Sequence, residues 1–136
     1  MQALYGNELK LAFEDILNLS KKYNMQTQTD SSLWNLISPQ DIKHDNVGFC
    51  AFVINYKGEF KVTSRVPVVL GSVLNNNLAN IFLKHPIMQQ FRKGSIAGCS
   101  KCKHFNVVCR GDRNASFERY GHFFGRDPGC WVDVAK

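Results

Sequence analysis

Hydrophobic residues first recur at helical spacing near the start of the chain. Within Asn7–Asn24 four of them lie three and four positions apart, namely Leu9, Phe13, Ile16 and Leu17. This spacing gathers them on one face of a helix, so the pattern predicts an amphipathic helix that packs through that face. The polar stretch Asp30–Asn46 then predicts a loop with a short apolar plug around Trp34, which we expect to be a packing residue.

The middle of the chain has the pattern of a β-hairpin. Phe49–Ile54 is a β-rich run, and Glu59–Thr63 alternates polar with apolar residues. Gly58 lies between them and suits a turn position with positive φ. We expect Val66–Leu70 either to continue the sheet or to bend away from it, and Gly71 to mark a further turn.

A helical segment is predicted over Asn75–Arg92. An Asn at its start is suited to capping free backbone amides. Pro86 lacks a backbone N–H and should divide the segment near His85, which we expect at a helix end or on the surface. Together these elements predict an α+β fold, a small β-hairpin or sheet with flanking helices and a cysteine-rich loop region.

The composition is that of one globular domain. The chain has 136 residues, of which 44% are hydrophobic and 21% are charged. No apolar run approaches the roughly 18 residues that span a bilayer, and the first ten residues lack the pattern of a secretory signal. We therefore expect a cytoplasmic protein without a membrane partner.

Charge is distributed unevenly along the sequence. Residues 1–48 carry four Lys or Arg and six acidic residues, whereas residues 84–126 carry nine basic and two acidic residues, a net charge of +7. A basic region of this kind is either a surface that attracts nucleic acid or an acidic peptide, or a solvated surface without a partner. It also offsets the negative charge of clustered thiolates.

Cysteines carry the strongest chemical signal. The chain has five, and four of them follow one spacing at the end of the sequence: Cys99, Cys102, Cys109 and Cys130. Clustered cysteines in a cytosolic chain favour metal or redox chemistry over disulfides. We expect Lys101, Lys103 and Arg110 to lower the pKa of these thiols and favour the thiolate form that binds metal.

Four thiolates fit either a structural zinc ion or a 4Fe-4S cluster. A zinc ribbon usually supplies two closely spaced pairs, whereas Cys109 and Cys130 stand alone. His104 and His122 do not have the spacing of a two-Cys two-His finger. The spacing favours the cluster and leaves zinc as the alternative.

The sequence around these cysteines resembles the SPASM/Twitch family, the auxiliary-cluster domains of radical SAM enzymes. The resemblance rests on Cys99-Ser-Lys-Cys102, Cys109-Arg-Gly111, a helical stretch over Asn114–Tyr120 that leads to Gly121, and Asp127-Pro-Gly-Cys130. Upstream, the hairpin around Gly58, Leu70-Gly71-Ser-Val73 and Leu78–Phe82 resemble the family's hairpin and following helix. The resemblance covers about Gly48 to Trp131.

The chain departs from the full family pattern in ways that imply a single cluster. Residues 63–65 and Asp112 stand where the family places cysteines of the first of its two auxiliary clusters. The resemblance thus implies one 4Fe-4S cluster with Cys99, Cys102, Cys109 and Cys130 as its ligands. We expect Cys50 to be a buried strand residue.

The resemblance further implies electron transfer or substrate support in a radical SAM enzyme that modifies a peptide or cofactor. The sequence has no Cys-x3-Cys-x2-Cys motif, so the SAM-cleaving barrel would be supplied elsewhere, in the same or another chain, and we expect no catalysis by this chain alone. Residues 1–47 are interpreted as an N-terminal helix and linker, a possible tail of that barrel, and residues 48–136 as the cluster domain. An acidic peptide is a candidate substrate. The alternative is a zinc-stabilised nucleic-acid-binding module.

Overall fold

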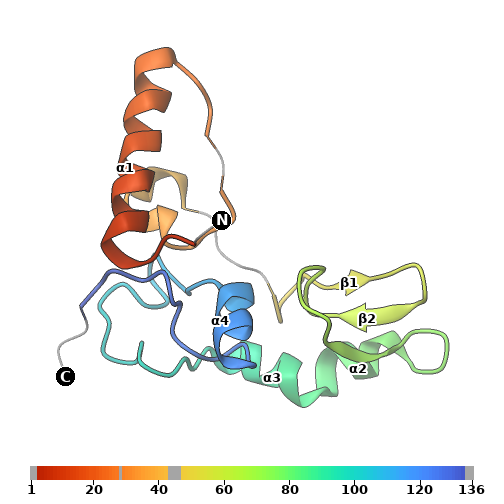
Figure 1. The fold of residues 1–136 in the computed structure, drawn as a ribbon. Coiled ribbons are helices and arrows are strands. Elements are labelled where there is room, and N and C mark those ends of the chain that lie inside the picture. The colour runs from red at the N-terminus through yellow and green to blue at the C-terminus, as the bar shows by residue number, and fades with distance from the viewer. Residues whose placement is uncertain (1–2, 28, 43–46, 134–136) are drawn as a thin grey trace. The chain divides into compact units, whose positions relative to one another are not determined.

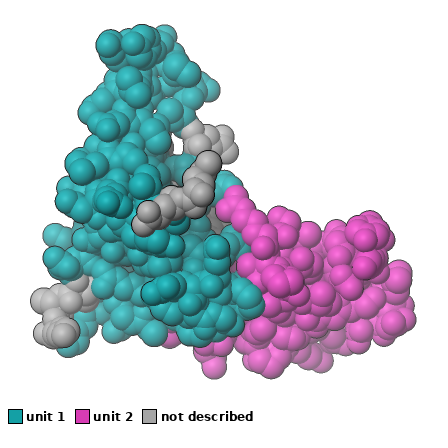
Figure 2. All heavy atoms as spheres, in the orientation of Figure 1, with its two compact units in different colours: residues 1–45, 96–136 teal, residues 46–95 magenta. Residues whose placement is uncertain are grey.

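The computed structural model describes residues 3–27, 29–42 and 47–133. Its fold is α+β: the described residues form four α-helices, two short 3-10 helices and a three-stranded antiparallel sheet (Figure 1). The chain divides into two compact units, coloured separately in Figure 2. Unit 1 comprises residues 1–45 and 96–136, and unit 2 comprises residues 46–95. No helix in the described residues is long and apolar enough to cross a membrane.

Unit 2 contains the predicted hairpin and a third strand. Strands β1 (Val53–Ile54), β2 (Glu59–Lys61) and β3 (Val69–Ser72) pair in that order. Gly58 has a φ of +73° at the turn between β1 and β2, as the sequence predicts. Phe60 in β2 is fully buried.

The prediction of a turn at Gly71 is wrong. Gly71 lies inside β3, where it pairs with Phe60. A Cβ at this position would lie 3.0 Å from Cδ1 of the buried Ile81, so the absence of a side chain at Gly71 leaves room for this core residue. The glycine therefore serves close packing on the sheet instead of chain reversal.

The helical segment that follows divides as Pro86 predicts. Helix α2 spans Leu78–Lys84 and α3 spans Pro86–Lys93. The Asn77 side chain caps α2 by accepting hydrogen bonds from two backbone amides, and His85 Nδ1 accepts one from the amide of Ile87 at the start of α3. His85 is thus the helix-end residue that the sequence predicts.

Cys50 differs from its prediction. It is exposed and lies in a turn, because the paired strand begins only at Val53. The apolar run Phe49–Ile54 has a strand-like composition, but most of it forms no ladder.

Unit 1 begins with the predicted amphipathic helix, α1, which spans Gly6–Tyr23. The ring of Phe13 makes edge-to-face contacts with Trp34 at 5.4 Å and with Trp131 at 6.1 Å between centroids. Ile16, predicted on the packing face, is 43% exposed. The face that packs is therefore narrower than the apolar stripe of the sequence.

The predicted loop after α1 contains 3-10 helices η1 (Trp34–Leu36) and η2 (Pro39–Asp41), and its last four residues, 43–46, lie outside the described part. Leu33 and Trp34 are buried, which confirms Trp34 as a packing residue. The loop contacts the distant cysteine-rich segment, since the Asn35 side chain donates to the carbonyl of Val108 at 2.9 Å. Residues 1–45 thus form one unit with residues 96–136, whereas the sequence interpretation divides the chain at residue 47.

Helix α4 (Arg113–Tyr120) matches the helical stretch predicted from the sequence. Asp112 caps its start through side-chain bonds from the amides of Asn114 and Ala115. Gly121 ends it with a φ of +74°. The helix begins at Arg113, shortly after Cys109, and therefore ends the loop that carries this cysteine.

Candidate metal centre

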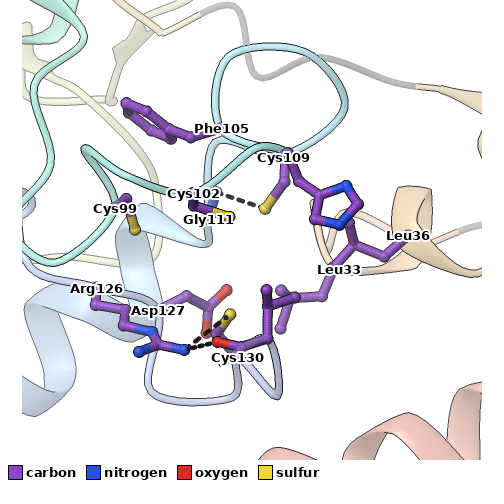
Figure 3. Close-up of a pocket in the computed structure, with 12 residues that line it drawn as sticks. Leu33, Leu36, Cys99, Cys102, Phe105, Cys109, Gly111, Arg126, Asp127 and Cys130 are labelled. Atoms are coloured by element: carbon purple, nitrogen blue, oxygen red, sulfur yellow. Dashed lines mark hydrogen bonds between the residues drawn. The ribbon is translucent and has the colours of Figure 1, made fainter. Parts of the chain in front are cut away.

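All four predicted ligand cysteines line one pocket of unit 1. Figure 3 shows them around a common space, with the sulfur atoms of Cys109 and Cys130 directed into it. We call this the sulfur pocket. Its lining consists of Leu33, Leu36, Cys99, Cys102, His104, Phe105, Cys109, Gly111, Arg126, Asp127, Cys130 and Val132.

Successive turns present the first two cysteines. The amide of Cys99 donates to the carbonyl of Ile96, and the amide of Cys102 donates to the carbonyl of Cys99 at 2.9 Å. The amide of Phe105 then donates to the carbonyl of Cys102 at 3.0 Å. From these turns both cysteines reach the lining of the sulfur pocket.

Cys109 lies in a separate turn, and a backbone amide two residues later donates a hydrogen bond to its sulfur. Its amide donates to the carbonyl of His104 at 3.1 Å, and the amide of Gly111 donates to Cys109 Sγ at 3.4 Å (Figure 3). Gly111 has a φ of +66°, and a Cβ there would lie 2.1 Å from Nη2 of the buried Arg113. Both the backbone and the packing therefore require glycine two residues after Cys109.

Cys130 is positioned by Asp127, a residue that is 5% exposed. The Asp127 carboxylate accepts hydrogen bonds from the amides of Asp112 and Gly129, both at 2.8 Å. The amide of Cys130 donates to the Asp127 carbonyl at 3.1 Å. One side chain thus joins the segment that carries Cys109 to the segment that carries Cys130.

Arg126 brings positive charge to the sulfurs. Its Nη2 donates to Cys130 Sγ at 3.6 Å and to the carbonyl of Val132 (Figure 3). The bond to Cys130 and the charges of the neighbouring thiols raise the pKa of Arg126, although burial opposes this. The guanidinium therefore stays charged throughout the physiological pH range.

The pKa values of two thiols differ from the sequence expectation. Burial raises the pKa of Cys109 to about 11, against the opposing effect of the Gly111 amide. Burial and Cys130 raise the pKa of Cys99, which Arg113 and Arg126 partly lower. The expected lowering by Lys101, Lys103 and Arg110 is wrong for these two thiols, because burial outweighs the nearby positive charge and the cations that act on Cys99 are other arginines.

Within residues 3–27, 29–42 and 47–133, no group of three or more His, Cys, Asp or Glu side chains could hold one metal ion. A 4Fe-4S cluster would be held by four thiolates, each bound to a different iron. The four thiols, the amide-to-sulfur bond and the adjacent guanidinium are chemically suited to an anionic cluster.

Several pocket residues were not found from the sequence. The sequence analysis did not indicate a function for Arg126 or Asp127. Both act through contacts made in the folded chain, and only the place of Asp127 in the Asp-Pro-Gly-Cys motif indicated locally that it belongs to the site. Among the nearby aromatic residues, Phe105 lines the pocket, whereas Phe123 is buried in the core.

Comparison with protein-family models, with curated proteins and with solved structures finds no match to this chain. The function is therefore inferred from the residues of the sulfur pocket and their geometry.

Proposed function

We propose that this chain carries one 4Fe-4S cluster, with Cys99, Cys102, Cys109 and Cys130 as its ligands. One observation carries the proposal: the four cysteines selected by their spacing, which come from separate turns of the chain, line the same pocket. The fifth cysteine, Cys50, is exposed and belongs to unit 2. The pocket thus contains the predicted set and leaves out the cysteine that was predicted not to be a ligand.

The spacing of the cysteines along the sequence favours a cluster over zinc. A zinc ribbon usually supplies two closely spaced pairs of cysteines, whereas Cys109 and Cys130 stand alone. A 4Fe-4S cluster needs four thiolates but no second close pair.

Each part of the pocket has a task in this proposal. The cysteines hold the cluster, while the Gly111 amide and the Arg126 guanidinium direct positive charge at sulfur. Leu33, Leu36 and Phe105 supply an apolar wall that limits water. When bound, the cluster supplies one-electron redox chemistry.

Full ligation by four cysteines leaves no iron open to substrate, which favours electron transfer or substrate support over Lewis-acid catalysis. In electron transfer, one electron enters from a one-electron donor and leaves to a one-electron acceptor, and no atom is transferred. On the motif resemblance we propose a SPASM/Twitch-like domain. It would serve a radical SAM barrel located elsewhere, because this sequence contains no Cys-x3-Cys-x2-Cys motif.

The decisive experiment is metal analysis of anaerobically purified protein. We expect about four irons and four sulfides per chain and a brown absorption band, all lost in Cys102→Ala. Cys50→Ala is the matched control, since it removes a cysteine outside the pocket and should keep the cluster. Equal loss in both variants, or a colourless protein without sulfide, contradicts the proposal.

The zinc-stabilised nucleic-acid module is the competing outcome of that experiment, with about one zinc per chain. The net charge of residues 84–126 favours a nucleic-acid-binding module more than the structure does. Arg92, Arg113 and Arg126, three of the nine basic residues in the charged region, donate to backbone carbonyls inside their units. Fewer basic side chains are thus available to an acidic partner, whether nucleic acid or peptide.

A further inference from the structure

Arg126 connects two of the cysteine-bearing turns. Its guanidinium donates to Cys130 Sγ at 3.6 Å and is held in place by the carbonyl of Val132. Its aliphatic part lies against Gly98, the residue before Cys99: a Cβ there would lie 3.6 and 3.7 Å from Cβ and Cδ of Arg126. Contacts of both the aliphatic part and the guanidinium therefore hold the Arg126 side chain beside the cysteines.

Neighbouring cations are placed differently. Arg113 points its guanidinium at the carbonyls of Phe123 and Gly125, at 2.8 and 3.1 Å, and forms part of the core. Lys101 and Lys103 flank Cys102 in sequence but are exposed, so water screens their charge. Arg126 thus combines a full charge, a direct bond to a ligand sulfur and incomplete access to water.

We propose that Arg126 sets the reduction potential of the cluster in the sulfur pocket, an inference that rests on the proposed function. A cluster ligated by four thiolates is negatively charged, and it becomes more negative when it accepts an electron. A fixed cation nearby stabilises the reduced state more than the oxidised state. Arg126 therefore raises the potential and favours electron acceptance.

Potentiometric titration of the reconstituted protein with dithionite, followed by electron paramagnetic resonance, tests this role. In Arg126→Gln we expect the ratio of reduced to oxidised cluster at a given potential to fall about tenfold, equivalent to a midpoint about 59 mV more negative. Arg126→Lys keeps the charge and should stay close to wild type. Arg119→Gln is the matched control, because it removes a charge from an exposed residue of α4 in the same unit.

The outcomes separate the two proposals. A wild-type protein that binds no iron and sulfide overturns the cluster itself, and this inference with it. A loaded Arg126→Gln with an unchanged midpoint overturns only the role of Arg126, as does an equal shift in Arg119→Gln. If Arg126→Gln fails to retain a cluster, Arg126→Lys decides: a midpoint near wild type supports the role of charge, and a tenfold loss of the reduced state contradicts it.

Discussion

The carboxylate of Asp127 accepts a hydrogen bond from the backbone amide of Asp112 at 2.8 Å, across fourteen intervening residues of sequence. Its other oxygen accepts the amide of Gly129. Asp112 is itself the N-cap of α4, so the helix start and the Cys130 turn are connected through one buried side chain. The geometry of the sulfur pocket therefore depends on a residue that is not one of its cysteines.

Replacement of Asp127 by alanine should destabilise unit 1. The change leaves the backbone amides of Asp112 and Gly129 without their acceptor, which costs about 1–3 kcal/mol for each buried group. The raised pKa of Asp127, caused by burial, means that loss of the charged carboxylate offsets part of this cost. Urea unfolding measures the difference, with the exposed Asp133→Asn as control; equal stability of both variants would contradict the role of Asp127.

Gly111→Ala should be more disruptive than Gly121→Ala. Both glycines have positive φ, which costs an alanine about 1–2 kcal/mol. A Cβ at Gly121 has open space, whereas one at Gly111 meets the guanidinium of buried Arg113. We expect Gly111→Ala alone to lose metal retention, as measured by iron content after gel filtration. Similar losses in both variants would indicate that only the backbone conformation matters.

The metal-free protein should lose stability as the pH rises from about 9 to 11. Burial raises the pKa of Cys109 from its ordinary 9.0 to about 11, so the folded state holds this proton more tightly than the unfolded chain does. The stabilisation is complete below pH 9.0 and disappears as the pH passes through the folded value. Urea midpoints measured across this range should vary less in Cys109→Ala, and Cys50→Ala should behave as wild type.

Alkylation should distinguish the exposed cysteine from the pocket cysteines. In metal-free protein at pH 8 we expect Cys50 to react first and Cys109 last, because Cys109 is partly buried and its raised pKa leaves little thiolate. Metal loading should protect the four pocket cysteines and leave Cys50 unchanged. Peptide mass spectrometry gives the order, and protection of Cys50 would place it in the site.

Local signals account for the elements that the sequence predicts well. Pro86 divides α2 from α3, Asn77 caps α2, and Gly58 forms the hairpin turn, because each effect depends on residues a few positions apart. Gly71 and Cys50 were mispredicted because the strand register, which the local composition does not determine, decides their environments.

The set of cysteines that lines the sulfur pocket was predictable from cysteine spacing, since turns keep the members of each segment close. The supporting residues were not. Arg126 and Asp127 act through Cys130, Val132 and Asp112, and Asn35 reaches Val108 from a segment 73 residues away. Such contacts depend on the whole of unit 1, whereas patterns along the sequence report mainly on neighbours.

The division of unit 1 into two stretches imposes an order on synthesis. Leu33 and Cys130 line the same pocket, yet residues 46–95 separate the two stretches to which they belong. The ribosome must therefore make unit 2 before the second stretch exists, and the first stretch waits without its partner. The pocket is complete only when Cys130 has left the exit tunnel, so the proposed cluster, held by all four cysteines, would be inserted after that point.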